Sequence, residues 1–379
     1  MSRWEVFAAL PNITLPDPSR SNLPLSAEVR DVAIVHGDDQ RVLDARSQSP
    51  AVNRLMSGFR THNDQAYTPS AIICRSSATV TGAAVISFRN AIALTSVLRS
   101  WATEHNNDAL IYTDWFDIFP AYETKAGHLI IMTPATKSLF ATGSKFLATP
   151  SPLGRLRPNY LAQDYYLTRA LTARWCRSYQ ENRDDHFSRA LFRSLEIAYT
   201  AAAAPMRSNA TEYEWGNNLA LWVSAIEVLA HPRSAHVSQA EALRLLGTYR
   251  WGSKKLDAPR RLIWPEGRKK ASVQVNAIQS AYHFLYKARN AYLHGNKVLK
   301  STMRPFKRAR GTTLVMIAPL IYRTALFAYL QRKVRPYQGL TNAEWRNARA
   351  APHLMPMVGE RMRVNMALSR MLWPSKQAE

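Results

Sequence analysis

Apolar residues recur at helical spacing through most of the chain after Asn159, and this periodicity restricts the fold more than any other feature. In residues 187–202 they fall three or four positions apart, which puts them on one face of an α-helix. Residues 211–230 are apolar on nearly every side, as is typical of a helix in the centre of a bundle. The sequence therefore predicts an all-α helical bundle over residues 160–335 and a helical tail over residues 336–379.

Capping residues mark where several of these helices begin and end. Thr211-x-x-Glu214 and Ser238-x-x-Glu241 match the capping box, in which two side chains satisfy otherwise unpaired backbone groups. Gly295 stands where a helix end accepts a positive φ. The helices expected in the bundle cover residues 161–175, 187–202, 211–230, 238–249, 272–294 and 313–334, with basic loops at 250–270 and 296–312.

Residues 1–150 show a different pattern and predict a smaller domain of mixed α+β structure, so the fold class expected for the whole chain is α+β. Residues 1–70 are rich in Pro, Ser, Asn and Asp, and we expect mostly loop with a strand or two around the apolar run 32–35. The next elements expected are strands at 72–74, 80–88, 109–119 and 128–132 and a helix at 89–103. Residues 151–159 are expected to be a linker.

The basic charge of the chain is confined to its C-terminal part. The formal net charge is +23, from 50 Lys and Arg and 27 Asp and Glu. Residues 1–150 carry 13 basic and 13 acidic side chains, which leaves 37 basic and 14 acidic ones in residues 151–379. Such asymmetry favours a polyanionic partner, nucleic acid before an anionic membrane surface. The alternative is a basic, solvated surface that has no partner.

Composition and motif content exclude several classes of protein. No apolar run reaches the roughly 18 residues of a membrane span, so we expect no membrane partner. Cys74 and Cys176 stand far apart, which excludes a disulfide scaffold and a cysteine-based zinc module. Residues 1–12 show no secretory signal, so a cytoplasmic location is expected. The sequence has neither a P-loop nor a Gly-x-Ser-x-Gly motif.

The sharpest local motif is Arg289-Asn290-Ala-Tyr-Leu-His294-Gly295, at the last turn of the helix expected over residues 272–294. Imidazole titrates near neutral pH, so His294 is a candidate general acid or base. The guanidinium of Arg289 stays charged and binds phosphate oxygens in a fork, which suits the charge that develops during RNA cleavage. Asn290 lies one turn before His294 on the same helix face, where it is a candidate to orient the imidazole or a phosphate.

This motif resembles that of the HEPN superfamily, in particular its Apea-like branch, whose α-helical bundles carry an Arg followed a few residues later by a His at the end of a helix. The segment 219–230, which contains Glu227, is similar to an earlier helix of that family. The order of the helices is kept as well. The resemblance covers roughly residues 160–335 and leaves residues 1–150 unassigned.

The resemblance implies metal-independent cleavage of RNA by attack of a 2′-OH on its own phosphate, with no cofactor. The catalytic residues that it implies are Arg289, Asn290 and His294, supported by Glu227 and Tyr292. It also implies a homodimer, because cleavage needs both a base and an acid while one chain supplies one such His. Toxins and antiviral effectors occur in this superfamily, so an antitoxin or a phage-derived trigger is a candidate partner.

Two basic segments flank the motif in the sequence and predict a track for the phosphates of RNA. The residues expected to bind RNA are Arg260, Arg261, Lys269 and Lys270 in the first segment and Lys297, Lys300, Arg304, Lys307, Arg308 and Arg310 in the second. The alternative is a pair of disordered basic loops without a ligand.

Structural roles compete with the catalytic ones at the same residues. A His before Gly often caps the free carbonyl groups of a helix end, and an Arg one turn earlier often pairs with a carboxylate such as Glu227. These roles favour a second hypothesis, a non-catalytic HEPN protein that binds RNA or partners as a scaffold. Tyr282, Tyr286 and Tyr292 offer rings that stack on bases, although aromatic residues at helical spacing more often belong to a core.

A third hypothesis relies on carboxylates of the N-terminal part. Asp114 or Asp117 with Glu123-Thr-Lys125 resembles the Asp…Glu-x-Lys pattern of Mg²⁺-dependent nucleases, in which the carboxylates hold the metal and the Lys polarises a phosphate. The segment 36–39, His-Gly-Asp-Asp, is a weaker cation candidate, and a polar turn is the favoured interpretation there.

Overall fold

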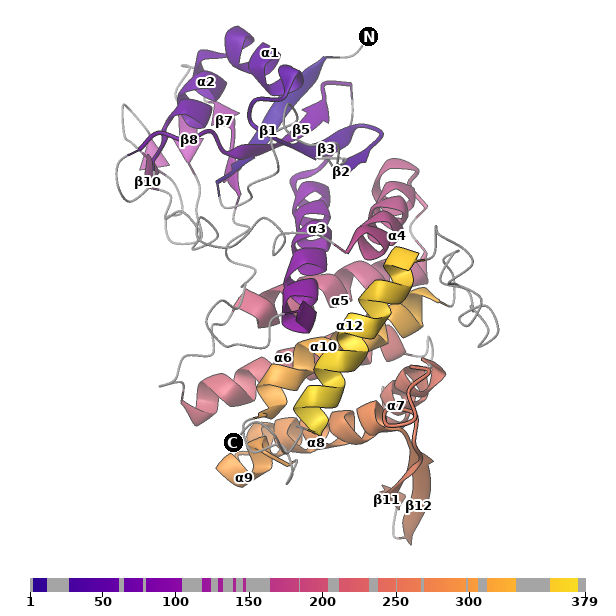
Figure 1. Cartoon of the computed structure of the whole chain (residues 1–379). Helices are drawn as coiled ribbons and strands as arrows, with labels where there is room; N and C mark the ends of the chain where they lie inside the picture. The colour runs from indigo at the N-terminus through magenta and orange to yellow at the C-terminus, as the bar shows by residue number, and fades with distance from the viewer. Residues whose placement is uncertain are drawn as a thin grey trace. The chain divides into compact units, whose positions relative to one another are not determined.

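The chain forms two compact units, each with its own core (Figure 1). The computed structural model describes residues 3–11, 27–60, 65–77, 80–103, 118–123, 129–131, 139–140, 146–147, 164–183, 185–203, 211–231, 238–249, 251–266, 269–297, 299–305, 312–331 and 355–373. Unit 1 comprises Met1–Ser96 and Ile111–Asp184, and unit 2 comprises Val97–Leu110 and Asp185–Glu379. The linker expected at 151–159 lies outside the described residues.

An antiparallel sheet of five strands, in the order β2-β3-β5-β1-β6, forms the centre of unit 1. Its strands are β1 (Trp4–Leu10), β2 (Ala27–Val29), β3 (Val32–Val35), β5 (Ser70–Arg75) and β6 (Phe119–Pro120). Every residue of β3 is buried, and so are the first five residues of β5. The apolar runs at 32–35 and 72–74 therefore form fully buried strands, as their sequence predicts.

Two helices that were not expected from the sequence pack on this sheet. α1 (Gln40–Gln48) and α2 (Pro50–Ser57) bury apolar side chains against β1, β3 and β5. Polar residues at the N-termini mark the starts of both helices. The side chains of Asp39 and Ser49 accept hydrogen bonds from backbone N–H groups there, and Pro50 occupies the first turn of α2. Residues that we expected to be mostly loop are helical because these caps start two short helices.

α3 (Gly82–Thr103) shows that the strand expected at 80–88 is wrong, because one helix spans most of that segment and the helix expected at 89–103. Val85, Phe88 and Ile92 are buried at helical spacing. A continuous apolar run is compatible with a buried strand or a buried helix, and periodicity alone does not separate the two.

α4 (Tyr165–Trp175) belongs to unit 1, although its residues were expected to open the helical bundle. Asp164 caps its start, and the indole N–H of Trp175 donates to the carbonyl oxygen of Ala84 in α3 at 2.8 Å. A short π-helix, η4 (Cys176–Gln180), continues α4. Cys74 and Cys176 are buried and free, in agreement with the absence of a disulfide scaffold.

Three further strand pairings occur in the described part of unit 1. β4 (Phe59–Arg60) pairs in parallel with β10 (Phe146–Leu147), and β7 (Tyr122–Glu123), β8 (Leu129–Ile131) and β9 (Leu139–Phe140) form a small antiparallel sheet. The strand expected at 128–132 is thus confirmed as β8. Most of the strand expected at 109–119 lies outside the described residues.

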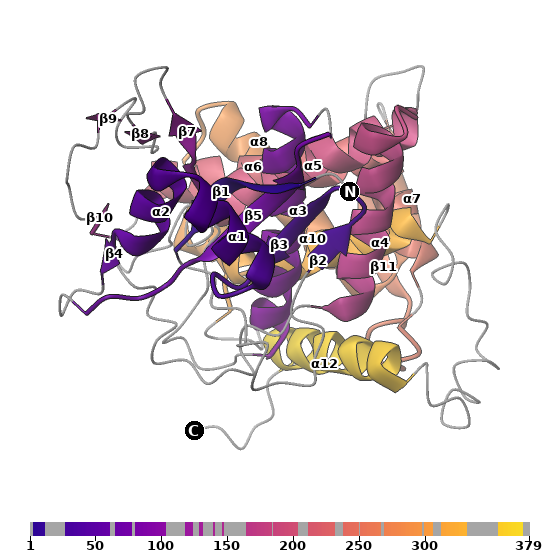
Figure 2. The same cartoon turned by 90° about the horizontal axis from the view of Figure 1, so that it is seen from above.

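Unit 2 is a helical bundle built around α6, and its predicted helices are confirmed, whereas the short helix α9 lies in the segment 296–312 that was expected to be a loop. Its helices are α5 (His186–Ala203), α6 (Glu212–Ala230), α7 (Gln239–Thr248), α8 (Ala277–Leu293), α9 (Lys300–Met303), α10 (Leu314–Leu330) and α12 (Met355–Leu372). α6 packs against α5, α7, α8 and α10, and it runs beside α8 in both views (Figures 1 and 2). The Ser194 hydroxyl donates to the carbonyl oxygen of Ala225 at 2.8 Å and lies 3.1 Å from the Tyr322 hydroxyl, which ties α5, α6 and α10 together.

One of the two predicted capping boxes forms. Thr211 and Glu214 make both reciprocal hydrogen bonds at the start of α6. Ser238 precedes α7 but makes no side-chain capping hydrogen bond, so the second box is wrong. A box that was not expected from the sequence, Asn276 with Gln279, starts α8 instead.

The basic segment at 250–270 is a loop only up to residue 259, because β11 (Arg260–Glu266) and β12 (Lys269–Val275) then pair as an antiparallel hairpin. α8 therefore begins at Ala277, five residues later than the expected start at 272. The apolar run 262–264 and the alternation of apolar and polar residues from Ala271 to Val275 are the strand signals that the high charge of the segment obscured.

Candidate functional site

His294 sits at the end of α8, and backbone hydrogen bonds fix that end. The backbone N–H of Asn296 donates to the carbonyl oxygen of Ala291 at 2.8 Å, and that of Gly295 donates to Tyr292 at 3.0 Å. This pair of bonds is the Schellman motif, which requires a left-handed residue after the cap. Gly295 fills that position with φ of 70°, as the sequence predicts, and His294 is the C-cap residue.

The last turn of α8 lies close to the first turns of α6. A Cβ atom added at Gly216 would overlap the ring of Tyr292, so the two helices approach closely enough there to require glycine. Tyr292 therefore packs in the bundle and holds the turn that carries His294. Gly216 was not among the residues predicted from the sequence, although an isolated glycine inside an apolar helix is a signal of such close approach.

Arg289 is the most connected residue of the motif. One terminal nitrogen of its guanidinium lies 3.5 Å from a carboxylate oxygen of Glu227 on α6, and the other donates to the Oδ1 of Asn290 at 2.9 Å. The guanidinium also lies 5.7 Å from the ring centre of Tyr286. The Arg289 and Glu227 side chains are 21% and 15% exposed, so this ion pair is largely shielded from solvent.

Two expectations about Arg289 and Asn290 are resolved by these contacts. The pairing of Arg289 with Glu227, expected for a structural role, is present. Asn290 directs its side-chain oxygen to Arg289, and only its backbone carbonyl accepts a hydrogen bond from the His294 backbone N–H, at 3.0 Å. Within the described residues, no hydrogen bond joins the Arg289 side chain to that of His294.

The direction of the Arg289 side chain explains this separation. Side chains on a helix lean toward its N-terminus, so Arg289 reaches back along α8 to Tyr286 and Glu227. His294 lies five residues further on, about 7.5 Å along the helix axis. One chain therefore presents the guanidinium and the imidazole at two different heights of the same helix.

A buried polar cluster surrounds the Arg289–Glu227 pair. Burial raises the pKa of the Glu227 carboxyl, and the nearby Arg289 charge partly opposes that rise. Burial also raises the pKa of the fully buried Tyr282 well above its usual value, and the Glu227 charge adds to the effect. Among the described residues, neither the Tyr282 hydroxyl nor the Arg289 Nε has a hydrogen-bond partner.

His294 itself is exposed, together with Leu293 and Lys297 on either side of it. Of the second set of RNA-binding candidates, Lys297 and Arg304 are exposed, and Lys300 begins α9. Lys307, Arg308 and Arg310 lie outside the described residues. The accessible imidazole thus has exposed basic residues close to it in the chain, as the sequence predicts.

The first set of RNA-binding candidates lies at the other end of α8. Val275, the last residue of the hairpin, is separated from α8 only by its cap residue, so the 17 residues of α8 stand between the hairpin and His294. At 1.5 Å per residue this separation is about 25 Å. The two basic segments flank the motif in sequence, but they occupy opposite ends of the helix.

Most residues of the N-terminal metal hypothesis lie outside the described part of the chain. Asp114, Asp117 and Lys125 lie outside it, and Glu123 is the last residue of β7. No group of three or more potential metal-binding side chains occurs in the part of the chain that is described. Segment 36–39 forms the expected polar turn, in which the His36 Nδ1 accepts the Asp38 backbone N–H at 3.1 Å.

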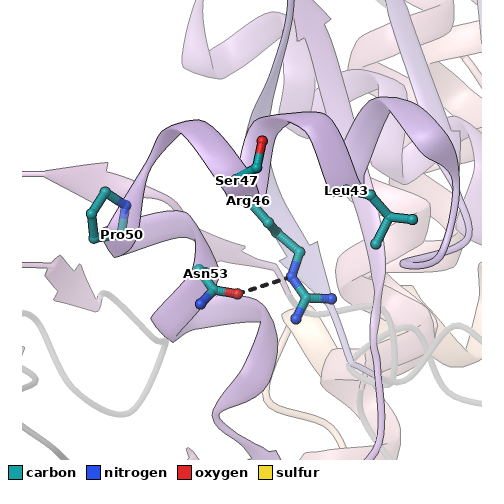
Figure 3. A pocket seen from close by; sticks show the side chains of 5 residues that line it. All are labelled: Leu43, Arg46, Ser47, Pro50 and Asn53. Atoms are coloured by element: carbon teal, nitrogen blue, oxygen red, sulfur yellow. Dashed lines mark hydrogen bonds between the residues drawn. The ribbon is translucent and has the colours of Figure 1, made fainter.

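A pocket of about 450 Å³ lies on unit 1, whereas the residues of the motif all belong to unit 2. Its walls come from α1 and α2, and the Arg46 guanidinium on one side donates to Asn53 on the other at 3.2 Å (Figure 3). The same guanidinium also donates to the Ser57 hydroxyl at 3.1 Å. The main cation of the pocket is therefore already bound within the protein.

Comparison of the chain with known protein families, characterised proteins and solved structures finds no match. None of the helices in the described part of the chain is long and apolar enough to cross a membrane.

Proposed function

We propose that this protein is a metal-independent endoribonuclease of the HEPN type. The observation that carries the proposal is the exposed imidazole of His294, fixed at the Schellman end of a helix that also presents Arg289. A general acid or base must be both accessible and held in place, and this position satisfies both conditions. The basic excess of residues 151–379 favours RNA as the substrate.

The reaction proposed is an internal transesterification. His294 takes the proton of a ribose 2′-OH, the 2′ oxygen bonds to the adjacent phosphorus, and the bond from phosphorus to the 5′ oxygen breaks. An acid returns a proton to the leaving 5′ oxygen, and the products are a 2′,3′-cyclic phosphate and a free 5′-OH. Arg289 stabilises the charge on the phosphate oxygens, and Glu227 with Asn290 positions its guanidinium.

A homodimer is part of the proposal, because base and acid are both needed and one chain presents one such imidazole. A two-fold axis near His294 brings a second motif to the phosphate. Large apolar side chains are exposed at this end of unit 2: Tyr213 in the first turn of α6 is 77% exposed, Leu293 52% and Leu299 49%. They offer the apolar contact surface that a second copy would cover.

The biological setting proposed is that of a toxin or antiviral effector, controlled by an antitoxin or by a phage-derived trigger. This part rests on the resemblance of Arg289-Asn290-Ala-Tyr-Leu-His294 to the HEPN motif. A location in the cytoplasm, where RNA is accessible, goes with this role.

A second candidate function is a non-catalytic HEPN protein that binds RNA as a scaffold. The observation that favours it is the engagement of Arg289 with Glu227 and Asn290, which is also how a purely structural arginine is held in a bundle. The two candidates agree on RNA binding and differ on whether His294 takes part in chemistry.

The test is RNA cleavage by the purified protein in the presence of EDTA, with analysis of the product ends. We expect cleavage that leaves 2′,3′-cyclic phosphates, and a loss of about 100-fold or more in His294→Ala. His231→Ala is the matched control, because His231 is an exposed histidine at the C-cap of α6. Arg289→Lys is expected to lose cleavage activity as well, since lysine keeps the positive charge but lacks the planar pair of N–H donors that binds two phosphate oxygens.

Four results would each contradict part of the proposal. Cleavage abolished by EDTA would favour the Mg²⁺-dependent alternative. Full activity in a folded His294→Ala variant would remove that residue from the chemistry. RNA binding without any cleavage by the wild-type protein would favour the scaffold. A specific activity that is constant at concentrations where light scattering shows only monomer would exclude the composite site.

A further inference from the structure

The hairpin formed by β11 and β12, which we call the ribbon, is a two-stranded arm of unit 2. Seven consecutive cross-strand pairs join Arg260–Glu266 to Lys269–Val275. At about 3.4 Å per residue, each strand is about 24 Å long. No third strand pairs with it among the described residues, and the ribbon extends away from α7 and α8 (Figure 1).

The base of the ribbon is anchored to the bundle by one face. Leu262 and Val275 on that face are 8% and 4% exposed. The guanidinium of Arg260 lies 4.6 Å from the ring centre of Trp373, which follows α12. A cation over an indole ring is a stabilising contact, so Arg260 holds the ribbon in place. It is the least suitable of the first four candidates for contact with RNA.

The opposite face of the ribbon is open to solvent. The register pairs Arg261 with Gln274 and Ile263 with Ser272, and all four residues are exposed, Ile263 by 59%. Arg261 donates to the Ser272 hydroxyl at 2.9 Å across the two strands. Val273 on the anchored face is also 44% exposed, so the outer part of the ribbon is accessible from both sides.

Beyond its anchored base the ribbon is a two-stranded hairpin, which alone is marginally stable in water, so a bound partner would stabilise its outer part. The charge of the ribbon indicates the class of partner. Its strands carry Arg260, Arg261, Lys269 and Lys270 against one acid, Glu266. A basic surface of this kind fits the phosphate backbone of a nucleic acid.

The groups on the open face favour paired over unpaired RNA. Binding of single strands relies on exposed aromatic rings that stack on bases. Among the side chains that the structure describes, the open face carries no aromatic ring; it offers a guanidinium, a hydroxyl and an amide, from Arg261, Ser272 and Gln274, beside the exposed Ile263. Duplex RNA is recognised through its phosphates and 2′-hydroxyl groups across a wide, shallow groove, and these side chains match those groups.

We propose that the ribbon binds a base-paired stem of RNA and so selects structured RNA as the substrate. The inference rests on the proposed function for the cleavage step that comes after binding. The base of the ribbon lies about 25 Å from His294 along α8. When a stem is bound to the ribbon, the RNA next to the stem is therefore the part that reaches His294. The substrate class is therefore an RNA stem joined to an unpaired stretch, which is cut in the unpaired part.

The binding experiment uses the full-length protein and an RNA duplex of about 20 base pairs without unpaired nucleotides. The variant is Arg261→Gln with Lys269→Gln and Lys270→Gln, and Arg193→Gln on α5 is the control, because Arg193 is exposed on another helix. We expect duplex binding to weaken by about 10-fold or more in the variant, and the slope of its salt dependence to fall by about one unit for each phosphate that is no longer bound. The control should bind as the wild type does.

The cleavage experiment compares kcat/KM on a stem-containing RNA with that on a short unpaired oligonucleotide. We expect the ribbon variant to lose much more activity on the first substrate than on the second. Circular dichroism that matches the wild type excludes misfolding, and the single variant Arg261→Gln repeats the test with a smaller change.

The outcomes separate the inference from the proposed function. Unchanged duplex binding in the ribbon variant would overturn the inference and leave cleavage by His294 untouched. An equal loss on duplex and single-stranded RNA would overturn the preference for stems. A changed oligomeric state with unchanged RNA binding would overturn it as well and assign the ribbon to a protein interface. Ribbon-dependent duplex binding by a protein that cuts no RNA would support the inference and refute the proposed function.

Discussion

Gly216→Ala gives the most direct test of how α6 holds the end of α8. The Cβ of the new alanine would lie 2.6 Å from the Tyr292 Cε2 and closer still to Cδ2 and Cγ. Rotation of the ring about its own axis leaves Cγ in place, so it does not relieve this overlap. Either the whole Tyr292 side chain leaves its site or the two helices move apart.

The expected effect is the difference of two terms. Alanine in place of glycine inside a helix stabilises it by about 1 kcal/mol. Overpacking of a well-packed contact costs about 1–3 kcal/mol. We therefore expect Gly216→Ala to lower the free energy of unfolding by about 1 kcal/mol, although the same substitution at an open helical site raises it.

Two further variants isolate the contact. A Cβ at Gly359 in α12 would have no atom within 4 Å, so Gly359→Ala should stabilise the protein by up to about 1 kcal/mol. In a Tyr292→Ala background the overlap is gone, and Gly216→Ala should then stabilise as well. The assay is urea unfolding followed by circular dichroism, with the four proteins of the Gly216–Tyr292 cycle measured together.

The sign of the change in unfolding free energy tests whether α6 and α8 approach closely at Tyr292. Stabilisation by Gly216→Ala in the wild-type background would refute the close approach of α6 and α8 at Tyr292. Because Tyr292 lies two residues before His294, we also expect slower RNA cleavage by Gly216→Ala than by Gly359→Ala.

The remaining predictions concern helix capping and pH. Thr211→Ala should lower the unfolding free energy by about 1 kcal/mol, because both hydrogen bonds of its capping box are present. Ser238→Ala should lower it much less, because Ser238 makes no capping hydrogen bond. Urea titrations of the two variants measure the difference. Burial and the charge of Lys287 lower the pKa of His283 to about 4 from 6.5, so the unfolded chain binds its proton first. The stability present above pH 6.5 should be lost progressively as the pH falls toward 4, and His283→Gln should reduce this loss; melting temperatures measured from pH 7 to 4 that change equally in both proteins would contradict it.

The helices of unit 2 were determined by sequence-local physics. An apolar face at helical spacing, the capping box at Thr211 and the glycine after His294 each act within a few residues, and each is found as expected. The same kind of reasoning failed where local signals conflicted. The segment 80–88 is a continuous apolar run that suits a strand or a helix, and its burial as a helix depends on the elements packed around it.

The candidate site was only partly contained in the sequence. Arg289, Asn290 and His294 were found from their spacing and from their place at a helix end. The partner of Arg289 was expected to be Glu227, and the contact is present, but the packing of α8 on α6 that brings the two side chains together is a tertiary contact. Gly216 was missed because its role depends on Tyr292, which lies 76 positions away in the chain.

The sequence by itself determined the helical character of the C-terminal part, its positive charge, and the placement of His294 at a helix end, since these depend on neighbouring residues and on composition. Tertiary structure alone decided that the strands of unit 1 join in the order β2-β3-β5-β1-β6, and that α6 and α8 approach closely at Gly216. Strand pairing and helix packing join residues that are distant along the chain. Their energies depend on three-dimensional contacts that no local pattern encodes.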